Sequence, residues 1–132
     1  MTLDEFIERG LCKLENLGWP SNSHVEEPGW DTLYVRLTRR LVDGVYYQPV
    51  LDLANLVVVE ELRGTGVFTK TVEKIRKTWP DLHIYVENVL EPRFDRHLTK
   101  EGYCRVGEVR DIGSSSYFLK SPRSEEVQAL RV

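Results

Sequence analysis

Several features are scarce in this sequence of 132 residues. It contains only two cysteines, Cys12 and Cys104, which form no CxxC pair, and its three histidines are scattered. We therefore expect reduced thiols and no metal site. The N-terminal segment MTLDEFIERGLCKLENLG is charged throughout, which predicts neither a signal peptide nor a membrane span. These absences indicate a cytoplasmic protein with no membrane partner.

An excess of positive charge is also lacking. Lys and Arg number 18 against 21 Asp and Glu, which gives a formal net charge of -3. Domains that bind nucleic acid in general carry a basic excess, so this class is disfavoured. A local patch remains open, because RLTRR brings together Arg36, Arg39 and Arg40. Those arginines form either the solvated face of a strand or a surface for an acidic or nucleic-acid partner.

What is present suits one folded domain. The length fits a single domain, and 41% hydrophobic residues suffice for a core of this size. We find no internal repeat and no low-complexity tract. We expect the domain to span residues 1–120, followed by a polar tail or short helix over residues 121–132.

The first half of the chain predicts one helix and then long strands. Apolar residues recur at helical spacing over residues 3–17, and Gly18 with Pro20 stops the pattern. The residues that give this 3.6-residue period are Leu3, Phe6, Ile7, Leu11, Leu14 and Leu17. Residues 21–31 read as a loop. Residues 32–42 alternate as a half-buried strand, and Asp43-Gly44 is a hairpin turn.

The segment after that turn, residues 45–59, predicts one bent strand or two short ones, with Pro49 at an edge or break. Its apolar run LANLVVV is typical of a strand covered on both faces. A helix over residues 65–79 and a strand over residues 82–87 follow. A right-handed crossover would make Leu53–Val59 and Leu82–Glu87 parallel neighbours.

The C-terminal part predicts a short helix over residues 91–102 and a closing hairpin, with strands at 103–110 and 115–120 around the DIG turn. Together these elements predict an α/β fold. Its centre would be a mixed sheet of six or seven strands, flanked by about four helices.

The stretch EELRGTGVFTKTVEKI carries the chemical signal. Two glycines stand where a strand gives way to a helix, and a helix N-terminus has free N–H groups with a partial positive charge. Glycines let the backbone approach a ligand, and Arg63 adds a planar cation suited to phosphate. The turn could therefore hold a diphosphate. It is not a P-loop or a Rossmann fingerprint, and a plain tight turn is the simpler alternative.

Two ordered motifs resemble the GNAT family of N-acetyltransferases. The stretch LVVVEELRGTGVFTKTVEKI resembles its acyl-CoA-binding motif, in which Arg63, Gly64 and Gly66 match. The stretch HIYVENVLEPRFDRHLTKEGY resembles its second motif through Asn88 and the Gly102-Tyr103 pair. The resemblance covers about residues 33–118. It implies a GNAT-like fold, and the compact length is similar to small phage-encoded members.

The resemblance further implies acetyl transfer from acetyl-CoA to an amine by direct attack in a ternary complex, without a metal. Backbone groups over Leu62–Phe68 with Arg63 would hold the diphosphate. An N–H near Val58 or Val59 would polarise the thioester. The residues expected to bind the cofactor are Val58, Val59, Leu62, Arg63, Gly64, Thr65, Gly66, Val67, Phe68 and Asn88.

Two positions depart from the family pattern. Phe68 replaces the final small residue of the first motif, so its side chain would either crowd the diphosphate or turn into the core. Leu98 replaces the tyrosine that usually protonates the leaving thiolate. His97 and Tyr103 are nearby candidates for this acid. The simpler interpretations are that His97 is a surface residue and Tyr103 a core residue.

Asp52 is the candidate general base, because a carboxylate inside the apolar stretch PVLDLANL needs a reason. The alternative places Asp52 in a turn or as a backbone cap. Asn88 would bond the pantetheine arm or pin two diverging strands. Glu60, Glu61 and Glu87 are further candidates for the general base, and the simpler interpretation makes each of them a surface charge. Trp19 and Trp30 would line an acceptor pocket or pack as a lid.

Two other functions remain open. One is a GNAT-fold binding or structural protein without turnover, which Phe68 and Leu98 favour. The other is a GNAT relative directed at nucleic acid, which the arginine strand favours. The acceptor amine, either a small molecule or a protein, is not encoded in any readable motif. A monomer and a homodimer are both compatible with the sequence.

Overall fold

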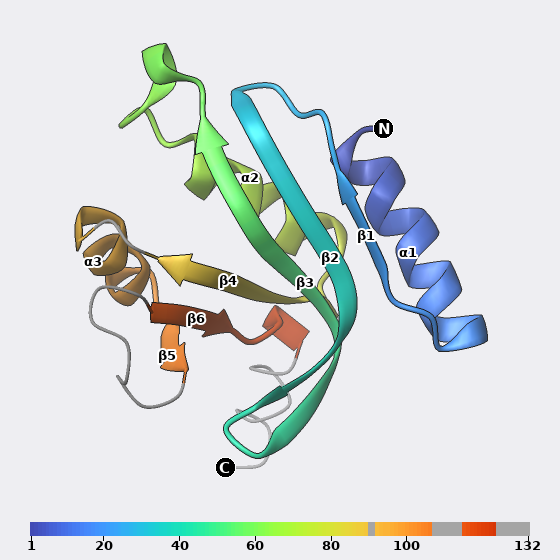
Figure 1. The fold of residues 1–132 in the computed structure, drawn as a ribbon. Coiled ribbons are helices and arrows are strands. Elements are labelled where there is room, and N and C mark those ends of the chain that lie inside the picture. Colours follow the sequence, from blue (N-terminus) through green and yellow to red (C-terminus); the bar gives the residue numbers. More distant parts are fainter. Residues whose placement is uncertain (90–91, 107–114, 124–132) are drawn as a thin grey trace.

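A mixed six-stranded sheet organises the molecule (Figure 1). The computed structural model describes residues 1–89, 92–106 and 115–123. The strand order is β1-β2-β3-β4-β6-β5, and β3 with β4 is the parallel pair. The elements are α1 (Leu3–Leu17), β1 (Ser21–His24), β2 (Trp30–Val42), β3 (Val45–Val58), the 3-10 helix η1 (Glu60–Leu62), α2 (Val67–Thr78), β4 (His83–Val89), α3 (Pro92–Lys100), β5 (Cys104–Val106) and β6 (Ser115–Leu119). The predicted mixed α/β sheet is confirmed, with three α-helices in the described residues.

Helix α1 begins and ends where the sequence predicts. The Thr2 hydroxyl accepts a hydrogen bond from the Glu5 N–H at 3.2 Å, and Gly18 ends the helix in the left-handed region. Leu17, the last residue of the apolar period, is 55% exposed. Gly10 faces the sheet instead, where a Cβ would lie 2.5 Å from the Leu37 Cδ2 atom. A residue without a side chain thus lets α1 approach β2.

The predicted loop over residues 21–31 is wrong in its first part, because Ser21–His24 form strand β1. This strand pairs antiparallel with β2, with Ser21 opposite Leu37 and His24 opposite Tyr34. Its residues are polar and carry no strand pattern. These residues form a strand because the edge of β2 offers them backbone hydrogen-bonding groups. The local sequence pattern of residues 21–24 gives no sign of that edge.

The β2–β3 hairpin closes at Asp43-Gly44, as predicted, with both residues at positive φ. Strand β3 is one long strand, which decides between the two predicted alternatives of one bent strand and two short ones. Pro49 is tolerated for two reasons. It faces an irregularity in the β2 ladder between Thr38 and Arg40, and β4 pairing starts only at Val50. No ladder hydrogen bond therefore needs the N–H that proline lacks.

The right-handed crossover through α2 makes β3 and β4 parallel, as predicted, but the pairing begins earlier. It joins Val50–Leu53 to His83–Val86. Only this paired part of β3 is buried on both faces. Burial of LANLVVV on both faces was therefore a wrong expectation, since Leu56, Val57 and Val58 are half-exposed.

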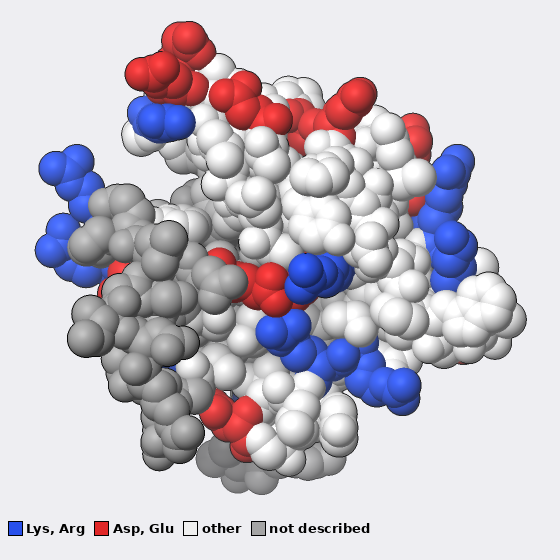
Figure 2. Space-filling model, in the orientation of Figure 1, with Lys and Arg blue, Asp and Glu red and all other residues white. Residues whose placement is uncertain are grey.

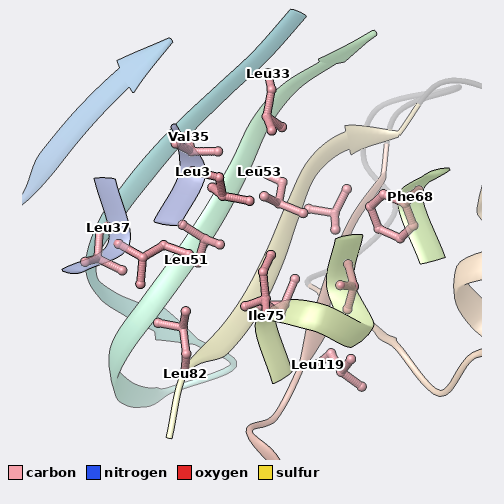
Figure 3. Packing of buried hydrophobic residues seen from close by; sticks show 14 of the residues in the cluster. Leu3, Leu33, Val35, Leu37, Leu51, Leu53, Phe68, Ile75, Leu82 and Leu119 are labelled. Carbon is pink, nitrogen blue, oxygen red and sulfur yellow. The ribbon is translucent and has the colours of Figure 1, made fainter. Parts of the chain in front are cut away.

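The main core lies between the sheet and α1 with α2 (Figure 3). Leucines of β2 and β3 face Leu3 of α1 and Ile75 of α2, and each of them is almost fully buried. A smaller cluster on the opposite face contains Val42, Val50, Tyr85 and Phe118. Strands β5 and β6 form the predicted antiparallel hairpin. The DIG turn and residues 124–132 of the expected tail lie outside the described residues.

No helix in the described part of the chain is long and apolar enough to span a membrane. Within the same residues, no group of three or more His, Cys, Asp and Glu side chains is placed to hold a metal ion.

Candidate active site

Strands β3 and β4 part immediately after the pair Leu53–Val86. At this level β3 contains a bulge: Leu53 pairs with Val35 and Asn55 with Tyr34, so Ala54 is the extra residue. Strand β4 is also irregular here, because its pairing with β6 skips from Val86 to Val89. Bulges bend the strand that carries them and are frequent beside active sites. We call this parting of the two strands the fork.

A groove of about 650 Å³ lies on the helix side of the sheet at the unpaired end of β3. The groove is lined by residues 56–58 of β3, by the turn over residues 62–66 (the glycine turn), by the start of α2, and by Phe94 and His97 of α3. Trp30 forms one wall. The Trp30 Nε1–H donates to the Thr71 hydroxyl at 3.2 Å, which fixes that wall against α2. The predicted cofactor residues that line this groove are Val58, Leu62, Arg63, Gly64, Gly66, Val67 and Phe68.

The backbone conformation of the glycine turn explains why two of its residues are glycines. Gly64 has φ 79° and Gly66 has φ 90°, a region that side-chain-bearing residues rarely adopt. No atom lies within 4 Å of a Cβ built on Gly64, and only the Lys70 side chain, at 4.0 Å, approaches one built on Gly66. The backbone conformation therefore demands glycine, while the space beside the turn stays open to a ligand.

The free N–H groups lie at the start of α2 and not along the whole turn. The N–H groups of Leu62, Arg63 and Thr65 already bond carbonyls within the turn, at 2.9, 3.3 and 3.1 Å. Of the backbone groups expected to hold a diphosphate over Leu62–Phe68, these three are therefore already engaged. Gly66 caps α2 without a side-chain hydrogen bond, and the first helical turn has no acidic residue. Its unpaired N–H groups and dipole suit an anion.

The side chain of Arg63 lies at the edge of the groove, where its Nε–H donates to the Val58 carbonyl at 3.4 Å. The two expected donors to a thioester differ. The Val59 N–H already bonds the Gly29 carbonyl at 2.9 Å, which removes Val59 as a candidate. Because successive N–H groups of a strand point to opposite edges, that of Val58 points away from β2 and toward the groove.

Phe68 turns into the core. Its side chain is 9% exposed, and its ring meets Phe94 edge to face at a centroid distance of 4.8 Å. It therefore leaves the space beside the glycine turn free. Leu98, at the position of the missing tyrosine, is fully buried and offers no acid.

His97 faces the groove from α3, and its Nε2 lies 3.0 Å from the Thr69 hydroxyl of α2. It also borders a second cavity of about 300 Å³, where Tyr103 lies. The Tyr103 hydroxyl is buried and has no hydrogen-bond partner in the described residues, and burial raises the pKa of this phenol well above its usual range. The backbone of Asn88 follows the fork in β4, while its side chain lies outside what the structure describes.

Asp52 lies in the middle of β3 and not in a turn, on the face of the sheet opposite α1 and α2. We call this the helix-free face, because none of the helices α1, α2 and α3 of the described residues covers it. It is fully buried, and its Oδ2 accepts from the Arg40 Nη1–H at 3.0 Å. Arg36 and Arg40 both reach Glu87 as well. Burial, then the neighbouring Glu87 carboxylate, raise the pKa of Asp52 to about 7, against the lowering effect of the two arginines.

Figure 2 shows acidic and basic side chains meeting near the centre of this helix-free face. We call Arg36, Arg40, Asp52 and Glu87 the charged cluster. Glu87, a candidate base for which a surface charge was the simpler interpretation, is 14% exposed and pairs with Arg36 and Arg40. The position of Glu87 near Asp52 follows from the register of β4 against β3, and this register depends on strand pairing. Two of the three arginines in RLTRR are neutralised here.

No protein-family model matches the chain, and no curated protein matches it. Among solved structures, the chain is similar to AtaTR bound with AcCoA, at 16% identity and a TM-score of 0.49, over 96% of this chain and 83% of that one. It is also similar to AtaT complexed with acetyl-methionyl-tRNAfMet, at 14% identity and a TM-score of 0.49, over 98% and 86% of the two chains. The KacTA–DNA complex matches at 16% identity and a TM-score of 0.48, over 98% and 85%. Likenesses this distant support no conclusion about activity, ligand or partner.

Proposed function

We propose that the chain is an acyl-CoA-dependent N-acyltransferase of the GNAT type, which moves an acetyl group from acetyl-CoA to an amine. One observation carries the proposal: a single groove runs from the start of α2, which has no side-chain cap, to the unpaired end of β3. That shape suits a ligand with an anionic end and a long arm that reaches the sheet. The stretch around Arg63 and Gly66 resembles the acyl-CoA-binding motif of the GNAT family, which implies the same kind of ligand.

The diphosphate would bind at the first turn of α2, with Arg63 as the cation. Unpaired N–H groups and the helix dipole stabilise an anion there, and a guanidinium adds charge-assisted hydrogen bonds. The pantetheine arm would extend along residues 56–58 of β3, whose outer edge has lost its β4 partner. Its amides can pair with these backbone groups as a further strand would.

The reaction needs a polarised thioester and a leaving thiolate. The Val58 N–H is our candidate donor to the carbonyl oxygen, and one such donor contributes about 3 kcal/mol to the transition state. Thiols have a pKa of about 8.5, so the thiolate leaves readily near neutral pH. His97, which faces the groove, is our candidate for the group that protonates it. Leu98 therefore does not exclude turnover.

The two alternatives lose support from the geometry. A binding protein without turnover was favoured by Phe68, which turns into the core and leaves the turn open. A nucleic-acid-directed protein was favoured by the arginine strand, in which Arg36 and Arg40 are paired with carboxylates.

The test measures the thermal midpoint with acetyl-CoA, with CoA and with ATP. A ligand at 100 times its Kd stabilises a protein by about 2.7 kcal/mol, or roughly 8 °C for a domain of this size. We expect this shift with both CoA species and not with ATP. No shift with CoA species at millimolar concentration would refute the proposal.

A matched pair of variants locates the site. Gly66→Glu places bulk and negative charge beside the proposed diphosphate and is expected to abolish the shift. Gly44→Glu is the control, because Gly44 has a similar φ of 83° and open space, but lies in the β2–β3 turn. Equal loss in both variants, or retention of the shift in Gly66→Glu, would contradict the site assignment. Release of free thiol in the presence of added amines then separates turnover from binding alone.

A further inference from the structure

The chain passes the start of β4 after it leaves β6. Strand β6 ends at Leu119, which pairs with Ile84 of β4. Two residues later, the Ser121 N–H donates a buried hydrogen bond to Nδ1 of His83, the first residue of β4, at 2.9 Å. Figure 1 shows this part of the chain, in red, beside the start of β4. We call residues 120–123 the strap.

Arg123 lies at the exposed end of the strap. Its N–H donates to the Pro80 carbonyl at 3.2 Å, and its guanidinium pairs with Asp81 at 2.8 Å. The side chains of Arg123 and Asp81 are 58% and 60% exposed, and ion pairs this exposed contribute little to stability. Ser121 and His83 are instead 2% and 6% exposed. The hydrogen bond between Ser121 and His83 is therefore the main anchor of the strap.

This anchor requires a particular protonation state of His83. A ring nitrogen that accepts a hydrogen bond carries no proton, so the neutral ring carries its proton on Nε2. A proton added to Nδ1 would turn the acceptor into a donor that faces the Ser121 N–H. Neighbouring rings hold the imidazole in this orientation, because it stacks on Phe118 at a centroid distance of 5.6 Å and meets Tyr47 edge to face at 5.1 Å.

The groups around His83 oppose a second proton on its ring. Burial, then the Lys120 ammonium of the strap, lower the pKa of His83 against the raising effect of Asp81. The Asp81 carboxylate is already paired with Arg123. From β3 the imidazole faces the phenol ring of Tyr47, which also lies 6.0 Å from the Lys120 ammonium. Acid therefore favours a structure in which the imidazole reaches water.

The strap borders a cavity of about 490 Å³ at the end of β3 away from the groove. The β3 residues at this cavity are 48 and 49, whereas those at the groove are 56–58. Arg123 forms part of the cavity wall, and the apolar side chains of the lining are Leu11, Leu14, Pro49, Trp79 and Leu82. Movement of the strap would therefore open this cavity and leave the groove in place.

We propose that His83 is a pH-sensitive switch, which holds the strap closed in its neutral form and releases it when Nδ1 takes a proton. In the open form, the His83 imidazole and the Ser121 N–H both reach water. The cavity then loses the part of its wall that Arg123 provides. The switch lies outside the groove and acts independently of the proposed acyltransferase function.

The size of the response follows from the proton balance. The pKa of His83 in the closed form lies below the ordinary value of 6.5, to which it returns when the imidazole reaches water. Below pH 6.5 the open form therefore binds more protons than the closed form. The ratio of open to closed strap rises by up to about tenfold for each unit that the pH falls, until the pH reaches the pKa of the closed form.

The first experiment follows protonation and opening in the wild-type protein. NMR of 15N-labelled histidine side chains reports the tautomer and the titration of His83, and hydrogen exchange reports opening at the Ser121 amide. We expect a proton on Nε2 alone at pH 7 and a titration midpoint below the ordinary 6.5. The protection factor of the Ser121 amide should fall about tenfold between pH 7 and pH 5, while the Ile84 amide keeps its protection.

The second experiment measures whether the cavity opens. In protein labelled with 5-fluorotryptophan, the fluorine NMR signal of Trp79 reports on the cavity and that of Trp30 on the groove. The variants Trp79→Phe and Trp30→Phe assign the two signals. We expect the Trp79 signal to move with the same midpoint as the titration of His83, and the Trp30 signal to stay in place.

A matched pair of variants tests the histidine itself. In His83→Asn, the amide oxygen stands in the place of Nδ1 and accepts the Ser121 N–H, but it takes no proton. We expect the Ser121 amide of this variant to keep its protection from pH 7 to pH 5. His24→Asn, which changes an exposed histidine of β1, is expected to respond to pH as the wild type does.

Several results would overturn the switch. These are a proton on Nδ1 of His83 at pH 7, unchanged Ser121 protection through the titration of His83, and loss of Ser121 and Ile84 protection together. A response in His83→Asn equal to that of the wild type would also overturn it, and the wild-type titration decides the question if this variant does not fold. The thermal shift with CoA species should be the same in His83→Asn and the wild type, and its absence from both would refute only the acyltransferase function.

Discussion

The buried carboxyl of Asp52 predicts an unusual dependence of stability on pH. Its pKa is about 7 in the folded protein, against an ordinary value of 3.8. A raised folded pKa means that the folded state binds the proton more tightly than the unfolded chain does. The stabilisation is fully present below pH 3.8 and is lost as the pH rises toward 7.

The size of the effect follows from the proton count. Where the folded state holds one more proton than the unfolded state, the free energy of unfolding falls by about 1.4 kcal/mol per pH unit. Between pH 5 and pH 7 this group would remove roughly 2 kcal/mol, which corresponds to about 1 M in the urea midpoint. Asp52→Asn cannot titrate, so this part of the pH dependence should disappear.

Urea unfolding at pH 5, 6, 7 and 8 measures the effect in the wild type and in Asp52→Asn. Asp31→Asn is the matched control, because Asp31 is an exposed aspartate on β2, and it should follow the wild type. If the wild type and Asp52→Asn lose stability in parallel between pH 5 and pH 7, the reasoning about this buried carboxyl is refuted.

Three further predictions concern packing and capping. Gly10→Ala should destabilise by about 1–3 kcal/mol, because its Cβ would meet the Leu37 side chain at 2.5 Å, and an unchanged urea midpoint would show that α1 moves away freely. Phe68→Ala should cost about 3–5 kcal/mol in the same assay, because the ring fills the space between α2 and α3, and a loss below 1 kcal/mol would mean that the ring is not core. Thr2→Ala should lower the stability by about 1 kcal/mol through the lost cap of α1, whereas Thr2→Ser should keep it.

Local patterns predicted much of this fold. The helical period and Gly18 set the end of α1, and Asp43-Gly44 set the β2–β3 turn, because each depends on a few neighbouring residues. The glycine turn was likewise readable, since positive φ restricts the residue type. The parallel crossover followed from the order of strand, helix and strand together with its fixed handedness.

Long-range strand pairing explains the structural features that could not be predicted from the sequence. Strand β1 exists because β2 offers an edge, and the fork exists because β4 leaves β3 after Leu53. The same register brings Glu87 to Asp52, although the two residues lie far apart in the sequence. The sequence pointed to Asp52 through its polarity in an apolar stretch. Glu87 was a candidate for the same role, but its place at the end of a predicted strand left a surface charge as the simpler interpretation.

The extra residue Ala54 determines which mutations strand β3 tolerates at the bulge. The bulge shifts the alternation of β3 by one position, so Asp52 and Asn55 share one face while Leu53 and Leu56 share the other. Loss of a single residue here would leave the composition almost intact but turn every later side chain of β3 to the opposite face. Leu56 would leave the core, and the groove would lose its wall. Substitutions at this point are therefore far better tolerated than a change in its length.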